Sequence, residues 1–162
     1  MAHIPDIQVT AVDSILQVIE FHKAFGHPTP DAPTMPPLQR KMLRIELIRE
    51  ELAELTHAIQ KEDLVEIADA LCDLRYVCDG AAIEFGIAAK FPALFDEVHR
   101  SNMSKACKDL AEAQATAKSE TEQTQIHQSS TGGYIIRRLD GKVIKSINYS
   151  PAKLEPILYE KP

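Results

Sequence analysis

One stretch of the sequence decides the fold: LQRKMLRIELIREELAELTHAIQKEDLVEIADALCDLRYVCDGAAIEF, residues 38–85. Residues 38–61 contain no glycine or proline and carry large apolar residues every three or four positions, which predicts a long amphipathic helix. Residues 64–85 repeat this spacing, so a second helix is predicted there, with Gly86 as its stop. Because only Glu62 and Asp63 separate the two, we expect them to pack antiparallel.

Flanking segments add two more helices. Residues 8–25 have helical spacing and precede a proline-rich segment, residues 26–37, which is predicted to be an extended loop. Pro92 suits the first turn of a fourth helix that extends to Met103. The sequence therefore predicts a mostly α protein built on a four-helix bundle.

The end of the chain is predicted to be a small β-hairpin. Apolar residues in 134–139 and 143–147 flank Asp140-Gly141, a typical two-residue turn. The preceding segment, residues 107–131, is polar and has few large apolar residues, so we predict a helical extension that frays into a linker.

Length and composition fit one soluble domain. The chain has 162 residues, of which 44% are hydrophobic and 26% charged, and its formal net charge is -6. We expect a single domain over residues 1–162, with a helical bundle core at 1–106, the polar segment at 107–131, and the hairpin and tail at 132–162. The acidic balance disfavours a nucleic-acid polymer as a partner.

Other sequence features favour a cytoplasmic protein. Three cysteines, Cys72, Cys78 and Cys107, are an odd number in a chain large enough to fold without disulfides. Residues 1–10 lack the pattern of a secretory signal, and no run approaches the roughly 20 apolar residues that a membrane span needs. We therefore expect no membrane association.

Six acidic residues occupy two predicted helix faces that can converge. Three fall within about 100° of arc on the first long helix and three within about 60° on the second: Glu50, Glu51 and Glu54, then Glu66, Asp69 and Asp73. Like charges gathered in this way repel unless a cation lies among them. Mg²⁺ prefers such oxygen ligands and completes its shell with water and phosphates, whereas the alternative is a solvated acidic helix face.

A di-iron site is a weaker alternative. Glu54 and His57 match one Glu-x-x-His unit of carboxylate-bridged di-iron bundles, which need two such units. Glu97 and His99 are only two residues apart and cannot supply the second unit from a regular helix.

Two motifs resemble those of a known superfamily. Residues 50–54, EELAE, and residues 66–69, EIAD, resemble the EExxE and ExxD motifs of the all-alpha nucleoside triphosphate pyrophosphohydrolases, which include MazG-like enzymes and phosphoribosyl-ATP pyrophosphohydrolase. The resemblance extends over residues 21–105 and 141–151, and residues 97–105, EVHRSNMSK, are similar to a segment of a MazG-like subgroup. It implies a MazG-like four-helix bundle with a small C-terminal β-hairpin.

The resemblance also implies an activity and its residues. A nucleoside triphosphate would be cleaved between its α- and β-phosphates to the monophosphate and pyrophosphate. Glu50 would orient or deprotonate the attacking water, and the Mg²⁺ ligands, with Mn²⁺ as an alternative ion, would be Glu51, Glu54, Glu66 and Asp69. Asp73 would bind a further ion, contact the sugar or only cap the acidic face.

Cationic and polar residues outside the acidic faces are the candidates for binding substrate, because an acidic protein needs local cations to hold a triphosphate. They are His22, Arg100, Asn102, Lys105, Lys142 and Lys145. The polar segment before the hairpin is longer than is usual in the superfamily, which bears on the position of the last two.

The same resemblance, together with the need of a lone hairpin for a packing surface, implies a homodimer or tetramer. Another class of function is a non-catalytic nucleotide-binding or regulatory helical oligomer that keeps the fold without turnover. The complete set of five acidic motif residues, four predicted ligands and Glu50, favours the enzyme.

Overall fold

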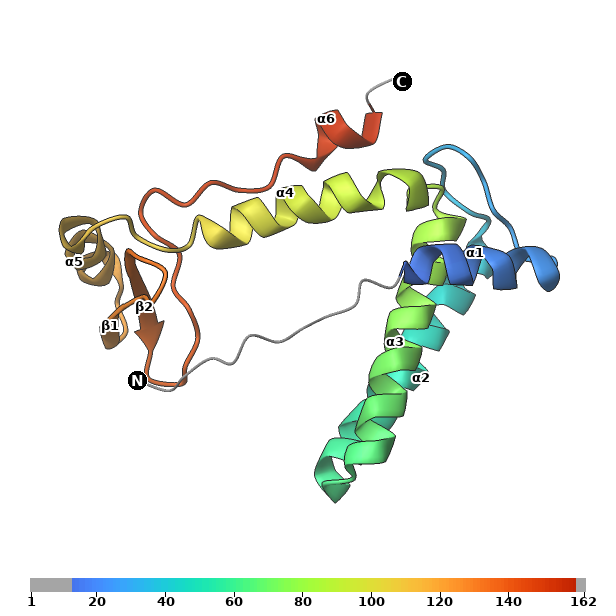
Figure 1. Ribbon diagram of the computed structural model, residues 1–162, viewed down its shortest axis with the longest axis horizontal. Coiled ribbons are helices and arrows are strands. Elements are labelled where there is room, and N and C mark those ends of the chain that lie inside the picture. The colour runs from blue at the N-terminus through green and yellow to red at the C-terminus, as the bar shows by residue number, and fades with distance from the viewer. Residues whose placement is uncertain (1–12, 160–162) are drawn as a thin grey trace. The chain divides into compact units, whose positions relative to one another are not determined.

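The computed structural model describes residues 13–159 (Figure 1). The chain forms two compact units, divided between Ala89 and Lys90, and each is described by itself. As predicted, the protein is mostly helical, with a small antiparallel hairpin near its C-terminus. Among the described residues, no helix has both the length and the apolar character that a bilayer span requires.

The first unit begins with helix α1, Ser14–Ala24. The Asp13 side chain accepts a hydrogen bond from the Leu16 amide and so caps the first turn. The helix stops before Gly26, whose φ of 68° lies in the left-handed region that favours glycine. The predicted helix over residues 8–25 is confirmed from Ser14 onward, while its first residues, 8–12, lie outside the described part of the chain.

Two long helices form an antiparallel pair, as the sequence predicts (Figure 1). Helix α2 spans Leu38–Lys61 and helix α3 spans Leu64–Glu84. Between them Glu62 adopts a left-handed conformation, φ 57°, and the Asp63 side chain accepts hydrogen bonds from the amides of Val65 and Glu66. The two-residue turn therefore both ends α2 and caps α3, which fixes how the acidic residues on the two helices face each other.

A buried ionic network joins α2 to the end of α3. Glu84 is 1% exposed and accepts hydrogen bonds from Arg40 and Arg44. Burial raises the pKa of Glu84, but the hydrogen bonds from the two guanidinium groups outweigh it and hold this pKa below its ordinary value. The Arg44 guanidinium lies against Gly80, where a Cβ atom would come within 2.7 Å of Arg44 Nη1. Glycine at position 80 thus makes room for the network.

The proline-rich loop, residues 26–37, is extended, as predicted, and it also packs on the end of α3. The Thr34 amide donates to the Phe85 carbonyl at 2.9 Å. Gly86 has a φ of 67°, and a Cβ atom there would lie only 1.9 Å from the Ala32 carbonyl oxygen. Gly86 therefore ends α3 and also permits close approach of the loop.

The second unit contains helix α4, Phe91–Met103, and helix α6, Leu154–Tyr159, which pack together. Pro92 lies in the first turn of α4, as predicted. A 3₁₀ turn, Ala88–Lys90, precedes it.

The predicted hairpin pairing is wrong. Strand β2, Tyr134–Arg138, pairs not with residues 143–147 but with strand β1, Thr124–Gln128. The Asp140-Gly141 turn does form, and the Ile144 amide still donates to the Ile136 carbonyl.

Helix α5, Leu110–Ser119, explains why the pairing of β2 with residues 143–147 stops. Ser146 donates to Glu112, and Thr116 accepts from the Ile147 amide at 3.1 Å. These hydrogen bonds hold residues 146 and 147 against α5 and away from β2. The edge of β2 opposite β1 therefore carries isolated bridges only, between Arg137 and Val143 and between Tyr134 and Cys107.

Residues 107–131, predicted as a helical extension and linker, are more ordered than expected. They contain helix α5, Leu110–Ser119, and strand β1. The segment is anchored by small residues rather than large apolar ones, because Cys107 and Ala113 pack with Ile136 and Ile144 in the core of this unit. The assignment of residues 1–162 to a single functional domain stays a prediction.

We expect Glu84→Gln to destabilise the first unit by about 3 kcal/mol, because it leaves two arginines beside a buried neutral side chain. Urea unfolding followed by the helical circular dichroism signal measures this loss. Glu20→Gln, on the exposed side of α1, is the matched control and should change stability little. Equal stability of the two variants would contradict a stabilising role for the network.

Candidate functional site

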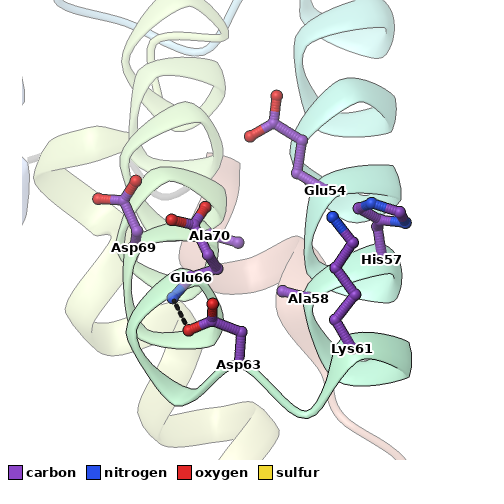
Figure 2. Close-up of a pocket in the computed structure, with 8 residues that line it drawn as sticks. All are labelled: Glu54, His57, Ala58, Lys61, Asp63, Glu66, Asp69 and Ala70. Atoms are coloured by element: carbon purple, nitrogen blue, oxygen red, sulfur yellow. Dashed lines mark hydrogen bonds between the residues drawn. The ribbon is translucent and has the colours of Figure 1, made fainter.

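A pocket of about 430 Å³ lies between α2 and α3, next to the turn that joins them. Figure 2 shows the side chains that surround it, contributed by both helices and by the turn. Its lining residues are Glu54, His57, Ala58, Lys61, Asp63, Glu66, Asp69 and Ala70.

Small residues at the helix contact make this pocket possible. Ala58 and Ala70 are 4% and 3% exposed, so the helices approach closely between them. The longer side chains stand around this contact, and Glu54 points from α2 toward α3 in Figure 2. Three of the four predicted metal ligands, Glu54, Glu66 and Asp69, thus line one pocket.

Glu51, the fourth predicted ligand, has an unusual environment. One of its carboxylate oxygens, Oε2, is buried and has no hydrogen-bond partner. Burial raises the pKa of Glu51 most, and the charges of Asp73, Glu54, Glu50 and Asp69 raise this pKa further. The carboxylates of the two helices therefore do act on one another, as the predicted convergence of the acidic faces requires.

Asp73 is the strongest of these charged neighbours of Glu51. The sequence left its role open between a further metal ligand, a sugar contact and a cap on the acidic face. Its effect on Glu51 identifies Asp73 as part of the acidic cluster, which we define as Glu50, Glu51, Glu54, Glu66, Asp69 and Asp73. A ligand role for Asp73 stays a prediction.

The carboxylate oxygens of the acidic cluster are suitable ligands for a hard cation. All are carboxylates, the ligands that Mg²⁺ prefers, and the buried Glu51 Oε2 is an acceptor that lacks a donor. Within residues 13–159, no three His, Cys, Asp or Glu side chains are already gathered around one metal position. The cluster fits Mg²⁺ by its chemistry, and the ligand set stays a prediction.

The candidate substrate-binding residues at the end of α4 form hydrogen bonds within the second unit. Arg100 forms hydrogen bonds from Nε and Nη2 to Glu97, at 2.7 and 2.8 Å, and also reaches Ser150 Oγ and the Pro151 carbonyl. Lys105 Nζ donates to Asn102 Oδ1 at 2.7 Å. Arg100 thus fastens the segment near residue 150 to α4, and substrate contacts of these residues stay predictions.

The two hairpin lysines lie apart from the β1–β2 ladder. The Lys142 amide donates to Asp140 Oδ1 at 3.0 Å, and the Lys142 side chain is exposed. Lys145 Nζ lies 4.5 Å from the centre of the Tyr149 ring, a cation–π contact.

His22 is buried in the first unit. It is 1% exposed, and its Nδ1 lies 3.1 Å from the Pro28 carbonyl oxygen, so it holds the loop after α1. Burial lowers the pKa of His22 and favours the neutral ring. A substrate contact of His22 stays a prediction.

Two pocket residues were overlooked in the sequence. The sequence suggests His57 as part of a di-iron unit, or as a surface residue or a neighbour of a metal ligand, and it gives Lys61 no role, yet both line the pocket with Glu54. Their spacing could have identified them, because residues three and seven positions after Glu54 lie on the same side of a helix as Glu54.

Comparison with known proteins gives the family of the chain. The family model described as phosphoribosyl-ATP pyrophosphohydrolase matches residues 18–102, just over half of the chain, and this range contains the whole acidic cluster. An uncharacterized protein of Acanthamoeba polyphaga mimivirus, L479, is 40% identical over 77 residues. That match covers 42% of this chain and 29% of the viral protein.

The family match supports a nucleotide pyrophosphohydrolase-like activity in general. The acidic motifs that first suggested this family lie on the facing helices α2 and α3, around the pocket between them. The chain therefore belongs to the phosphoribosyl-ATP pyrophosphohydrolase family.

Proposed function

We propose that this protein is a Mg²⁺-dependent nucleoside triphosphate pyrophosphohydrolase, with Mn²⁺ as an alternative ion. The observation that carries the proposal is the unpartnered, buried oxygen of Glu51 amid four other carboxylates. A cluster of this kind is stabilised by a cation, and a cation held there attracts the phosphates of a nucleotide.

Five of the six residues of the cluster have a proposed task. Glu51, Glu54, Glu66 and Asp69 would hold the metal ion, which when bound neutralises charge on phosphate oxygens and favours ionisation of water. Glu50 is exposed on α2 and has no hydrogen-bond partner or ion pair within the described residues, so it is free to orient or deprotonate a water molecule.

The reaction proceeds by attack of this water on the α-phosphorus. The water oxygen bonds to the α-phosphorus as the bond to the oxygen that bridges the α- and β-phosphates breaks. Pyrophosphate leaves with the bridging oxygen, and the nucleoside monophosphate remains. Glu50 accepts the proton of the attacking water.

Self-association is a second part of the proposal. Four residues of α2 at seven-residue spacing form an exposed apolar stripe: Leu38, Ile45, Leu52 and Ile59. Heptad spacing is typical of a helix that packs along another helix. We assign this stripe to a second copy of the chain.

Metal-dependent turnover tests the proposed activity. We expect pyrophosphate release from at least one member of a panel of canonical and modified nucleoside triphosphates with Mg²⁺, and loss of this activity on chelation with EDTA. Glu51→Gln and Asp69→Asn should each lower kcat/KM at least about 100-fold, because each removes a charged cation ligand.

Glu46→Gln is the matched control for these variants. It makes the same chemical change on α2, at an exposed residue paired with Arg49 and outside the acidic cluster. Turnover should stay near that of the wild type. Absence of turnover across the panel would contradict the enzymatic proposal and favour a non-catalytic nucleotide-binding protein.

The apolar stripe predicts a change in oligomeric state. Light scattering after size-exclusion chromatography should show a dimer or tetramer for the wild type and a smaller species for Ile45→Lys, since a buried lysine would be unpaired at the helix contact. Gln39→Lys introduces the same charge beside the stripe and should leave the assembly intact. A monomeric wild type would overturn the assignment.

A further inference from the structure

The pocket between α2 and α3 is not lined by acidic residues alone. Lys61 and His57 contribute an ammonium group and an imidazole ring to its wall. In Figure 2 the Lys61 side chain extends from the end of α2 back toward His57 and Glu54. This direction is the usual one for a helix, because side chains lean toward the helix N-terminus.

Helix geometry brings these groups to one flank of α2. At 100° per residue, Glu50, Glu54, His57 and Lys61 fall within about 60° of arc. The rise per residue separates Glu54 from Lys61 by about 10 Å along the axis. The flank therefore has a carboxylate end, with the proposed base and metal ligand, and a cationic end beside the turn.

Neither Lys61 nor His57 has a side-chain partner elsewhere in the described structure. Within residues 13–159, Lys61 Nζ and the His57 ring form no hydrogen bond or ion pair. Some basic side chains near buried acids or loops do have protein partners, such as Arg44 with Glu84 and Arg100 with Glu97. Lys61 and His57 thus keep their donors available at the wall of a pocket.

We propose that Lys61 and His57 bind the β- and γ-phosphates of the substrate, the part that leaves as pyrophosphate. This inference rests on the proposed function. A lysine ammonium is a strong point-charge partner for phosphate, and the imidazole ring adds a second donor. With the α-phosphate near Glu54, the rest of the chain of phosphates extends toward the cationic end.

The two residues act on the leaving group during hydrolysis. As the bond from the α-phosphorus to the bridging oxygen breaks, negative charge develops on the departing pyrophosphate. Lys61 lies where it can neutralise that charge, while Glu54 on the same flank of α2 and the carboxylates of α3 that line the pocket would hold the cation. The pocket therefore separates the groups that activate water from those that stabilise the leaving group.

Binding of inorganic pyrophosphate tests the inference directly. Isothermal titration calorimetry with pyrophosphate and Mg²⁺ should give a dissociation constant at least about tenfold weaker for Lys61→Gln than for the wild type. Lys61→Arg should retain most of the affinity, since it keeps the charge. His57→Ala should weaken binding less than the loss of the lysine does.

Kinetics and a matched control complete the experiment. Lys61→Gln should raise KM for the triphosphate and the inhibition constant of pyrophosphate together, whereas Lys41→Gln, on the same helix outside the pocket, should change neither. Wild-type pyrophosphate affinity in an active Lys61→Gln variant would overturn this inference and leave the proposed function intact. A wild type without turnover would overturn the proposed function and this inference with it.

Discussion

The two-residue turn at Glu62 and Asp63 is the constraint on which the candidate site depends. It reverses the chain between two long helices and begins the second with a side-chain cap. Because the reversal is so short, residues shortly before it on α2 come opposite residues shortly after it on α3. Glu54 and Lys61 thereby share a pocket with Glu66 and Asp69.

Electrostatic repulsion among the clustered carboxylates is the reason to expect a cation at this site. The fold brings carboxylates together and leaves one oxygen of Glu51 buried without a donor. Such an arrangement costs free energy in the absence of a cation, and a protein tolerates that cost where binding compensates for it. The contrast with Glu84 is informative, because that buried carboxylate is matched by Arg40 and Arg44. The buried acid Glu84 is satisfied by the protein, whereas the buried oxygen of the partly exposed Glu51 has no protein donor.

The sequence predicted the first unit better than the second. Residues 38–61 and 64–84 have strong helical spacing and a clear turn between them, so α2 matches its predicted bounds and α3 differs by one residue. Strand β1 was missed because Ile126 is its one large apolar residue, and its place beside β2 depends on backbone pairing that composition does not reveal. Tertiary contacts through Glu112 and Thr116 then decide where residues 146 and 147 go.

The sequence likewise predicted some features of the candidate site and missed others. Spacing alone placed the acidic residues, Asp73 included, on two faces, but the buried oxygen of Glu51 became apparent only in the packed helices. Arg100 could not be assigned from its charge, since its partners Ser150 and Pro151 lie some fifty positions further along the chain.

Binding of Mn²⁺, followed by its electron paramagnetic resonance signal in solution, tests the central claim most directly. The account predicts that the wild type binds Mn²⁺ in competition with Mg²⁺, and that Glu51→Gln weakens this binding at least about tenfold while Glu46→Gln does not. Equal Mn²⁺ binding by the wild type and Glu51→Gln would contradict the assignment of the acidic cluster as the metal site.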